Sequence, residues 1–197
     1  MASKLICFPK SCRMGTALCV LAVSSAAFSL PVQADNFNLP GAKFYSGNGN
    51  IIYLAAAVGL PLLRDGQDKK EHALRAADAI GTSVLLSEGL KSVIKEKRPD
   101  SNSHDSFPSG HATAAFAAAA VESQWHPKEA PYWYAGAALI SVSRVSLNRH
   151  YTQDVVAGAA LGYFTARLEL SQRRGLILSP FISPHNGGVG LQLSRGL

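Results

Sequence analysis

Residues 107–121 read FPSGHATAAFAAAAV, a polar segment that ends at a proline and passes directly into an alanine-rich run. Proline restricts the residue before it to extended backbone geometry, which predicts that a loop ends there. Ser109 is a favoured N-cap, and the alanines after it predict a helix over 109–124. The start of a helix carries unpaired N–H groups and a partial positive charge, which suit an anion. Gly110 lets such an anion approach the backbone, and His111 can exchange a proton with it.

Four further helices are predicted around this one. Apolar residues at helical spacing, together with the positions of Pro and Gly, place them at 51–63, 71–98, 132–144 and 150–172. Residues 35–50 are rich in Asn, Gly and Pro, which predicts an irregular lead-in with a turn at 46–50. The expected fold is therefore all-α, a bundle of about five helices in which short connections make consecutive helices antiparallel.

The segment after the last predicted helix has a different pattern. Apolar and polar residues alternate over 189–194, and a Pro- and Gly-containing stretch separates this run from the apolar run 176–182. The pattern predicts a short β-hairpin or else an unpaired tail, because an isolated hairpin is only marginally stable. We therefore expect a helical domain over 35–175 and a C-terminal tail or hairpin over 176–197.

The N-terminal segment resembles a secretory signal peptide. Basic side chains precede a mostly apolar run at 14–30, and small residues near Ala34 suit a signal peptidase, so we expect residues 1–34 to be cleaved and the domain exported. The alternative is an uncleaved membrane anchor. All cysteines lie in this leader, so the remaining chain is expected to contain no disulfide and no thiolate metal site; they are Cys7, Cys12 and Cys19.

The charge of the chain is mild once the leader is removed. The net charge is +6 for all 197 residues, and the leader holds three basic residues and no acidic one. The expected mature domain then has 16 basic and 13 acidic side chains, a net charge of +3. This composition does not favour a nucleic-acid partner.

Cations and histidines are expected to converge at one end of the bundle. Lys91 and Arg98 lie seven residues apart on the predicted helix 71–98, so they share a face. In an antiparallel bundle, the end of this helix lies beside the start of the helix 109–124. The end of the helix 132–144 and the start of the helix 150–172 lie at the same end of the bundle. The residues that meet at this end are Lys91, Arg98, Ser109, His111, Arg144 and His150.

A second spacing adds a carboxylate to this group. His150 and Asp154 are four residues apart on the predicted helix 150–172, so Asp154 can accept a hydrogen bond from one ring nitrogen and leave the other free as a nucleophile or base. On the same face, Gly158 and Gly162 predict close packing of this helix against a neighbour.

Two histidines and three permanent cations around a helix start describe a phosphate pocket. Guanidinium forks and an ammonium group balance a dianion and the charge of its transition state. Because the nearby carboxylates are few and the cations would repel a divalent ion, no metal and no cofactor are expected.

The residues also match a known signature. Its three parts are Lys91, six intervening residues, Arg98 and Pro99; then residues 108–111; then Ser143, Arg144, five residues, His150, three residues and Asp154. This resembles the signature of the type 2 phosphatidic acid phosphatase superfamily, which includes bacterial acid phosphatases and vanadium haloperoxidases. The match spans about a third of the chain.

The resemblance implies a helical bundle and metal-independent phosphoester hydrolysis. By position, His150 would attack phosphorus to form a phosphohistidine, Asp154 would orient it, and His111 would protonate the leaving oxygen and then activate water. The phosphate oxygens would be held by Lys91, Arg98, Ser109, Gly110 and Arg144.

Several readings of the substrate stay open. Phe107 and Ala112 flank the central motif and resemble the lipid-phosphatase branch, whose substrates would include phosphatidic acid, phosphatidylglycerol phosphate, undecaprenyl diphosphate and lipid A phosphates. The alternatives are a periplasmic acid phosphatase for small soluble phosphomonoesters, a vanadium haloperoxidase, and a non-catalytic anion-binding module. The partners expected are thus a phosphorylated lipid or small phosphoester and a membrane surface.

Membrane topology is a separate question. Charged residues are spread along the predicted helices, and no stretch after residue 34 reaches 18 uncharged apolar residues, which favours a soluble or membrane-associated periplasmic domain. The alternative is an inner-membrane protein whose active site faces outward.

The remaining polar side chains are expected to be solvated or are assigned no role; they are His72, His104, Asp105, His126, Arg149 and His185.

Overall fold

The computed structural model describes residues 37–172, which form six α-helices and, within that range, no strand. The all-α fold expected from the sequence is confirmed, with one more helix than predicted. The predicted leader and C-terminal hairpin lie outside the described residues. In chain order the helices are α1 (Ala42–Ser46), α2 (Asn48–Arg64), α3 (Lys69–Ile94), α4 (Gly110–Trp125), α5 (Ala130–Ser146) and α6 (Thr152–Ser171).

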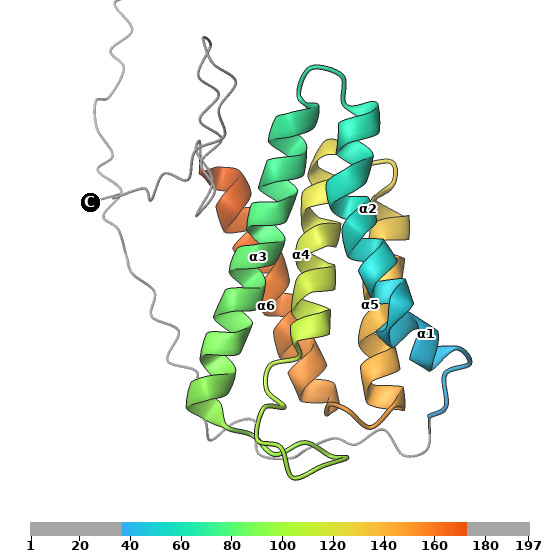
Figure 1. Cartoon of the computed structure of the whole chain (residues 1–197), viewed down its shortest axis with the longest axis vertical. Coiled ribbons are helices and arrows are strands. Elements are labelled where there is room, and N and C mark those ends of the chain that lie inside the picture. The colour runs from blue at the N-terminus through green and yellow to red at the C-terminus, as the bar shows by residue number, and fades with distance from the viewer. Residues whose placement is uncertain (1–36, 173–197) are drawn as a thin grey trace, which may run out of the picture.

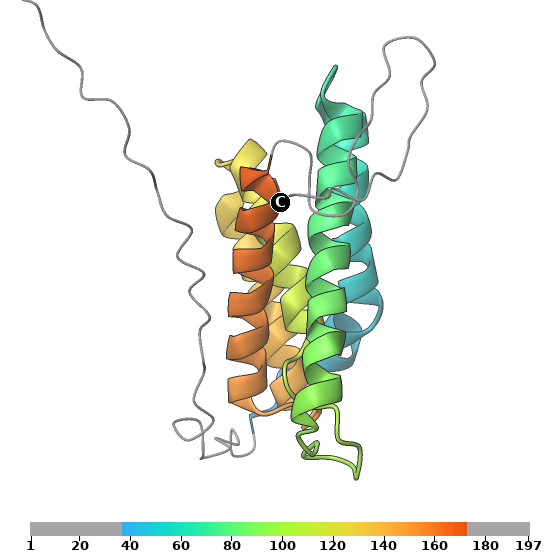
Figure 2. The same cartoon turned by 90° about the vertical axis from the view of Figure 1, so that its left-hand side faces the viewer.

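The alanine-rich helix α4 is the centre of the bundle. It packs against α3, α5 and α6, and Figures 1 and 2 show it enclosed between them. Nearly every side chain from Ala112 to Glu122 is buried, because neighbours cover this helix on several sides. A helix surrounded in this way is apolar all round, which explains why alanine, rather than an amphipathic pattern, dominates its sequence.

Two glycines of α6 allow it to approach α4 closely. A Cβ atom added at Gly158 would lie 2.6 Å from the carbonyl oxygen of Ser109, and one at Gly162 would lie 2.0 Å from that of Thr113. Neither distance leaves room for a methyl group, so the close packing predicted for this stripe is confirmed. The contact holds the first turn of α4 against the second and third turns of α6.

The lead-in predicted over 35–50 is wrong for residues 42–50. Residues 42–46 form α1, and α2 begins at Asn48 rather than at residue 51. Asn and Gly are poor helix formers, but here tertiary packing outweighs propensity: Asn50 is buried, and α1 packs against α5.

Two helix ends are also corrected, and both move a site residue into a loop. Helix α3 stops at Ile94, because Lys95 adopts a left-handed conformation (φ 51°), so Arg98 follows the helix instead of sharing a face with Lys91. Helix α6 starts at Thr152, because the Asp154 carboxylate accepts a hydrogen bond from the Tyr151 backbone at 2.9 Å and caps the helix. His150 therefore precedes α6.

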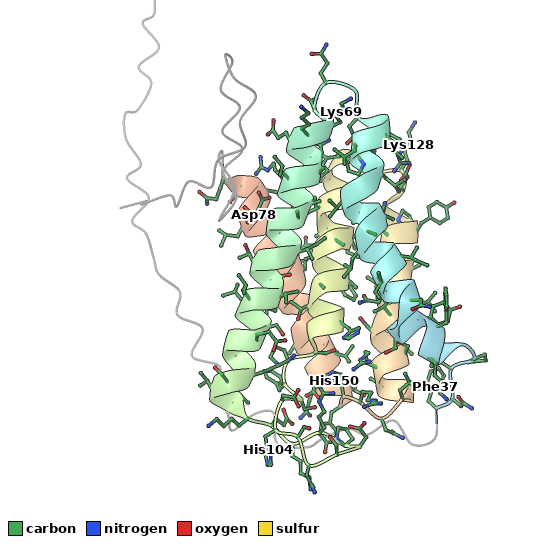
Figure 3. The ribbon with its side chains drawn as sticks, in the orientation of Figure 1. Phe37, Lys69, Asp78, His104, Lys128 and His150 are labelled. Atoms are coloured by element: carbon green, nitrogen blue, oxygen red, sulfur yellow. The ribbon has the colours of Figure 1, made fainter. Side chains whose placement is uncertain are left out.

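The helices alternate in direction, as predicted. The α3–α4 loop, the α5–α6 loop and α1 gather at one end of the bundle (Figure 1). His104 and His150 lie at this end, whereas Lys69 and Lys128 lie at the other (Figure 3). Between residues 37 and 172, no helix combines the length and apolar character needed to cross a membrane.

Candidate active site

His150 is held by a backbone oxygen from the loop before α4. Its side chain is buried, and Nδ1 lies 2.8 Å from the carbonyl oxygen of Ser106. A carbonyl oxygen can only accept a hydrogen bond, so Nδ1 carries the proton and the neutral ring has its lone pair on Nε2. This is the tautomer that a nucleophilic imidazole needs.

Asp154 is placed beside His150 without a direct hydrogen bond to it. Its Oδ2 atom lies 3.6 Å from His150 Nδ1, too far for a hydrogen bond, and instead accepts one from the Ser106 hydroxyl at 2.5 Å. The direct bond expected from the i, i+4 spacing is thus corrected, because His150 lies outside the helix. Asp154 acts on the ring through its charge and through Ser106.

Ser106 is a site residue that the sequence reasoning missed. It contacts both members of the predicted pair, through its carbonyl oxygen and its hydroxyl, and it is completely buried. Its own N–H donates to the carbonyl oxygen of Glu96 at 2.9 Å, which ties the loop to the end of α3. Its position directly before the central motif is the one signal in the sequence that could have indicated it.

His111 occupies the first turn of α4 among positive charges. Burial, followed by the nearby charges of Arg144 and His150, lowers the pKa of His111 to about 4, although a hydrogen bond with the Ser46 backbone acts in the opposite direction. Burial also lowers the pKa of His150, and Arg144 and Arg98 add to this effect while Asp154 opposes it. Both imidazoles are therefore neutral at pH 7 in the ligand-free protein.

Arg144 reaches the site from the last turn of α5. Arg144 is 9% exposed, and its guanidinium donates to the hydroxyl of Ser46, a contact with α1 that no pattern in the sequence predicts. Burial, then the charges of Arg98 and Arg149, lowers the pKa of Arg144 to about 10, with Asp100 opposing. A buried cation surrounded by like charges is a favourable place for an anion.

The other predicted cations approach the same point. Arg98 pairs with Asp105 at 2.8 Å, so Asp105 is not merely a solvated loop residue. The Lys91 ammonium pairs with Glu88 at 2.6 Å. A Cβ atom added at Gly110 would lie 3.4 Å from Lys91 Nζ, which places this ammonium beside the start of α4.

Several buried polar groups at the site lack hydrogen-bond partners within the described part of the chain, among them the acceptor Oδ1 of Asp154. Three that can donate are Nε of Arg98, Nε of Arg144 and the hydroxyl of Ser109. Ser109 is the N-cap residue of α4, as predicted, but its hydroxyl caps no backbone N–H. An oxyanion placed among them would accept these hydrogen bonds and offset the cost of leaving buried donors unsatisfied.

The remaining ionisable residues lie apart from this group or at its edge. Arg149 is half exposed and pairs with Asp100 at 3.0 Å. At the far end of the bundle, Asp65 contacts His72 at 2.5 Å and His126 at 3.1 Å. Within residues 37–172, no group of three or more His, Asp or Glu side chains is arranged to hold a metal ion.

Comparisons with known proteins identify a family and two curated relatives. Residues 72–177 match the model of a family described as the PAP2 superfamily. Over 109 residues the chain is 30% identical to lipid A 1-phosphatase of Porphyromonas gingivalis, an alignment that covers 52% of this chain and 24% of the relative. Over 98 residues it is 37% identical to phosphatidylglycerophosphatase B of Bacillus subtilis, covering 42% of this chain and 48% of the relative. The chain thus spans less than half the length of these relatives.

The fold is similar to a solved structure as well. The crystal structure of LpxE from Aquifex aeolicus superimposes with a TM-score of 0.51, covering 73% of this chain and all of that chain at 22% identity. This similarity concerns the helical fold.

Proposed function

The chain belongs to the PAP2 superfamily, and from this membership we propose that it is a phosphatase that hydrolyses the terminal phosphate of a lipid. The observation that carries the proposal is the set of unpartnered buried donors beside two neutral histidines. Arg98, Arg144 and Ser109 supply these donors, and the arginine charges act on His150 and His111. A phosphate group satisfies these donors and neutralises the cations.

The proposed reaction has two steps. Nε2 of His150 attacks phosphorus, the bond from phosphorus to the leaving oxygen breaks, and His111 gives that oxygen a proton. A water molecule then attacks the phosphohistidine while His111 takes its proton, which releases inorganic phosphate and restores His150. Lys91, Arg98, Arg144, Ser109 and the Gly110 amide stabilise the charge on the phosphate oxygens, so the chemistry assigned to the side chains requires no metal ion.

In the proposed reaction, binding of the negatively charged substrate favours protonation of His111. In the free protein the cations and burial hold the pKa of His111 near 4, so the ring is largely unprotonated above that pH. A bound dianion counters the positive charge of Arg144 and Lys91 and raises this pKa, which favours the protonated, acidic form in the complex. Proton donation is thereby coupled to substrate binding.

A lipid is favoured over a small soluble phosphoester by the relatives and by the motif. The two curated relatives carry the names of phosphatases for lipid A and for phosphatidylglycerophosphate. Phe107 and Ala112 flank the central motif as expected for the lipid-phosphatase branch. We further propose export to the periplasm after cleavage near Ala34, with a membrane surface as the source of substrate; N-terminal sequencing of the isolated protein tests the cleavage.

Turnover by the purified protein tests the proposed function. We expect vanadate-sensitive release of phosphate from phosphatidic acid or phosphatidylglycerol phosphate in detergent micelles, unaffected by EDTA. His150→Ala should abolish it, whereas His104→Ala, in the exposed part of the α3–α4 loop, should leave it unchanged. No turnover of any lipid phosphate or of p-nitrophenyl phosphate would reject the enzyme, and bromide oxidation with vanadate and peroxide would indicate a haloperoxidase instead.

A further inference from the structure

A groove that the proposed reaction does not use runs along the outside of the bundle. It has a volume of about 660 Å³ and lies between α1, α2 and α5. This volume is within the range of small-molecule sites. Its lining is mostly aromatic and aliphatic and includes Phe44, Ile52, Tyr132, Trp133, Leu139 and Ile140.

The floor of the groove presents carbon rather than polar atoms. Tyr53 packs edge-on against Trp133, with ring centroids 5.1 Å apart, and its hydroxyl donates to the Trp133 carbonyl oxygen at 2.7 Å. A Cβ atom added at Gly136 would lie 2.7 Å from the Tyr53 ring, so the absence of a side chain there makes room for this ring. Because the one hydroxyl of the floor is already paired, the floor suits a hydrocarbon.

The rim of the groove is mostly apolar and is uncovered, and the carboxylate of Glu129 in the lining is paired with Arg64 at 2.9 Å. Ile52, Tyr132 and Leu139 line it and are 60%, 79% and 41% exposed. Large apolar side chains gathered at a concave surface gain free energy when a ligand covers them. A peptide segment laid here would bury backbone amides against a wall that offers few partners, whereas an alkyl chain has no polar group to satisfy.

One end of the groove meets the phosphate-binding residues. Tyr45 lines the groove, and its neighbour Ser46 accepts a hydrogen bond from Arg144 and hydrogen-bonds His111 through its backbone. On α5, Ile140 lies one turn before Arg144, and Trp133 lies eleven residues before it, which is about 16 Å along the helix axis. The groove therefore starts beside the site and leads away from it along α5.

We propose that this groove holds an acyl chain of the lipid whose phosphate occupies the active site. The inference rests on the proposed function, because it assigns the apolar part of the same substrate. Short helix α1 is the link between the two parts: its aromatic side chains line the groove, while Ser46 at its end holds Arg144 in the phosphate site. Affinity for the substrate then depends on chain length, while the chemical step depends on the phosphate pocket.

Kinetics with two substrates tests the inference. Leu139→Asp and Ile52→Asp each place a charge on the exposed rim. We expect each to raise KM for a long-chain phosphatidic acid on the order of tenfold, the equivalent of about two buried methylene groups, without changing kcat/KM for p-nitrophenyl phosphate. The matched control is Phe164→Asp, because Phe164 is 68% exposed on α6 and does not line the groove.

Two kinetic outcomes would overturn the inference. An equal loss with both substrates would mean that the variants disturb the site rather than the binding of a chain. An equal rise in KM for Phe164→Asp would mean that the effect is not specific to the groove, and that any apolar surface of the bundle contributes to KM by contacting the micelle.

A binding measurement separates this inference from the proposed function. Trp133 lines the groove and the chain has two tryptophans, so Trp125→Phe leaves Trp133 as the single tryptophan. We expect phosphatidic acid with a brominated acyl chain to quench its emission in the full chain, and Leu139→Asp to reduce the quenching. Quenching without turnover would retain the groove and reject the phosphatase, whereas turnover without quenching would reject the groove.

Discussion

The carbonyl oxygen of Ser106 accepts a hydrogen bond from Nδ1 of His150 at 2.8 Å, while the hydroxyl of the same serine donates to Asp154 at 2.5 Å. A residue outside the three-part signature therefore connects the histidine to the carboxylate. The carbonyl oxygen fixes the tautomer of His150, because it can only accept a hydrogen bond. Because Ser106 is completely buried, both of its contacts are shielded from water and hold the ring in place. Ser106 is accordingly a positioning residue for the proposed nucleophile.

We expect Ser106→Ala to lower kcat by about 10- to 100-fold while KM changes little. Without the hydroxyl, Asp154 no longer anchors the loop that carries the Ser106 carbonyl oxygen, so the His150 ring is less well aligned for attack. The cations proposed to bind phosphate are untouched, which should preserve KM. Steady-state kinetics on p-nitrophenyl phosphate measures both constants, and Ser101→Ala in the exposed part of the loop is the control. A change confined to KM would contradict the positioning role.

The low pKa of His111 can be measured directly. NMR titration of the ligand-free protein should place the pKa of this imidazole near 4, because burial and the charges of Arg144, His150 and Lys91 disfavour the protonated ring. Arg144→Gln removes one of these charges, so the pKa should rise toward its ordinary value. Arg149→Gln removes a half-exposed cation that does not act on His111 and should leave the titration unchanged. An unchanged pKa in Arg144→Gln would exclude this electrostatic coupling.

Gly162 should be intolerant of any side chain. A Cβ atom there would meet the Thr113 carbonyl oxygen at 2.0 Å, so Gly162→Ala forces α6 away from α4 and should lower the free energy of unfolding by about 2 kcal/mol. Gly89→Ala is the matched control in another helix, because nothing lies within 4 Å of its added methyl group. That control should raise stability by about 0.5–1 kcal/mol by restricting the unfolded chain. Urea denaturation measures both changes, and equal effects would contradict the packing argument.

Buried Glu122 should make stability fall as the pH rises. Burial raises the pKa of Glu122 to about 7, although His126, whose ring nitrogen lies 3.3 Å away, opposes the shift. The native state therefore holds a proton that the unfolded state loses near its ordinary pKa of 4.5, so stability is lost between about pH 4.5 and pH 7. Glu122→Gln removes this dependence.

We expect the free energy of unfolding of Glu122→Gln, relative to wild type, to increase by about 2 kcal/mol between pH 5 and pH 8. Glu169, whose pKa is also raised to about 7 by burial, is present in both proteins and cancels in the comparison. Denaturation curves at the two pH values give the difference. A difference that stays constant with pH would show that Glu122 is not protonated in the native state.

Local patterns determined much of this protein. Helical spacing, Pro and Gly positions and an alanine-rich run predicted five of the six helices, because each signal lies within the segment that it describes. The same reasoning predicted which helix ends meet, because short connections leave few alternatives to an antiparallel bundle. The spacing of the signature residues was also sufficient to identify the family, which the match over residues 72–177 confirms.

The contacts that complete the site were decided by tertiary structure. Arg144 is held by Ser46, 98 residues away, and His150 by Ser106, 44 residues away. Helix α1 formed where the local sequence predicted an irregular lead-in, and His150 lies before α6 rather than on it. No local pattern encodes these outcomes, because each depends on which residues from distant segments meet after the helices pack. The motif FPSGH indicated where phosphate would bind, whereas the packed bundle determined how the histidines are held and placed an apolar groove beside them.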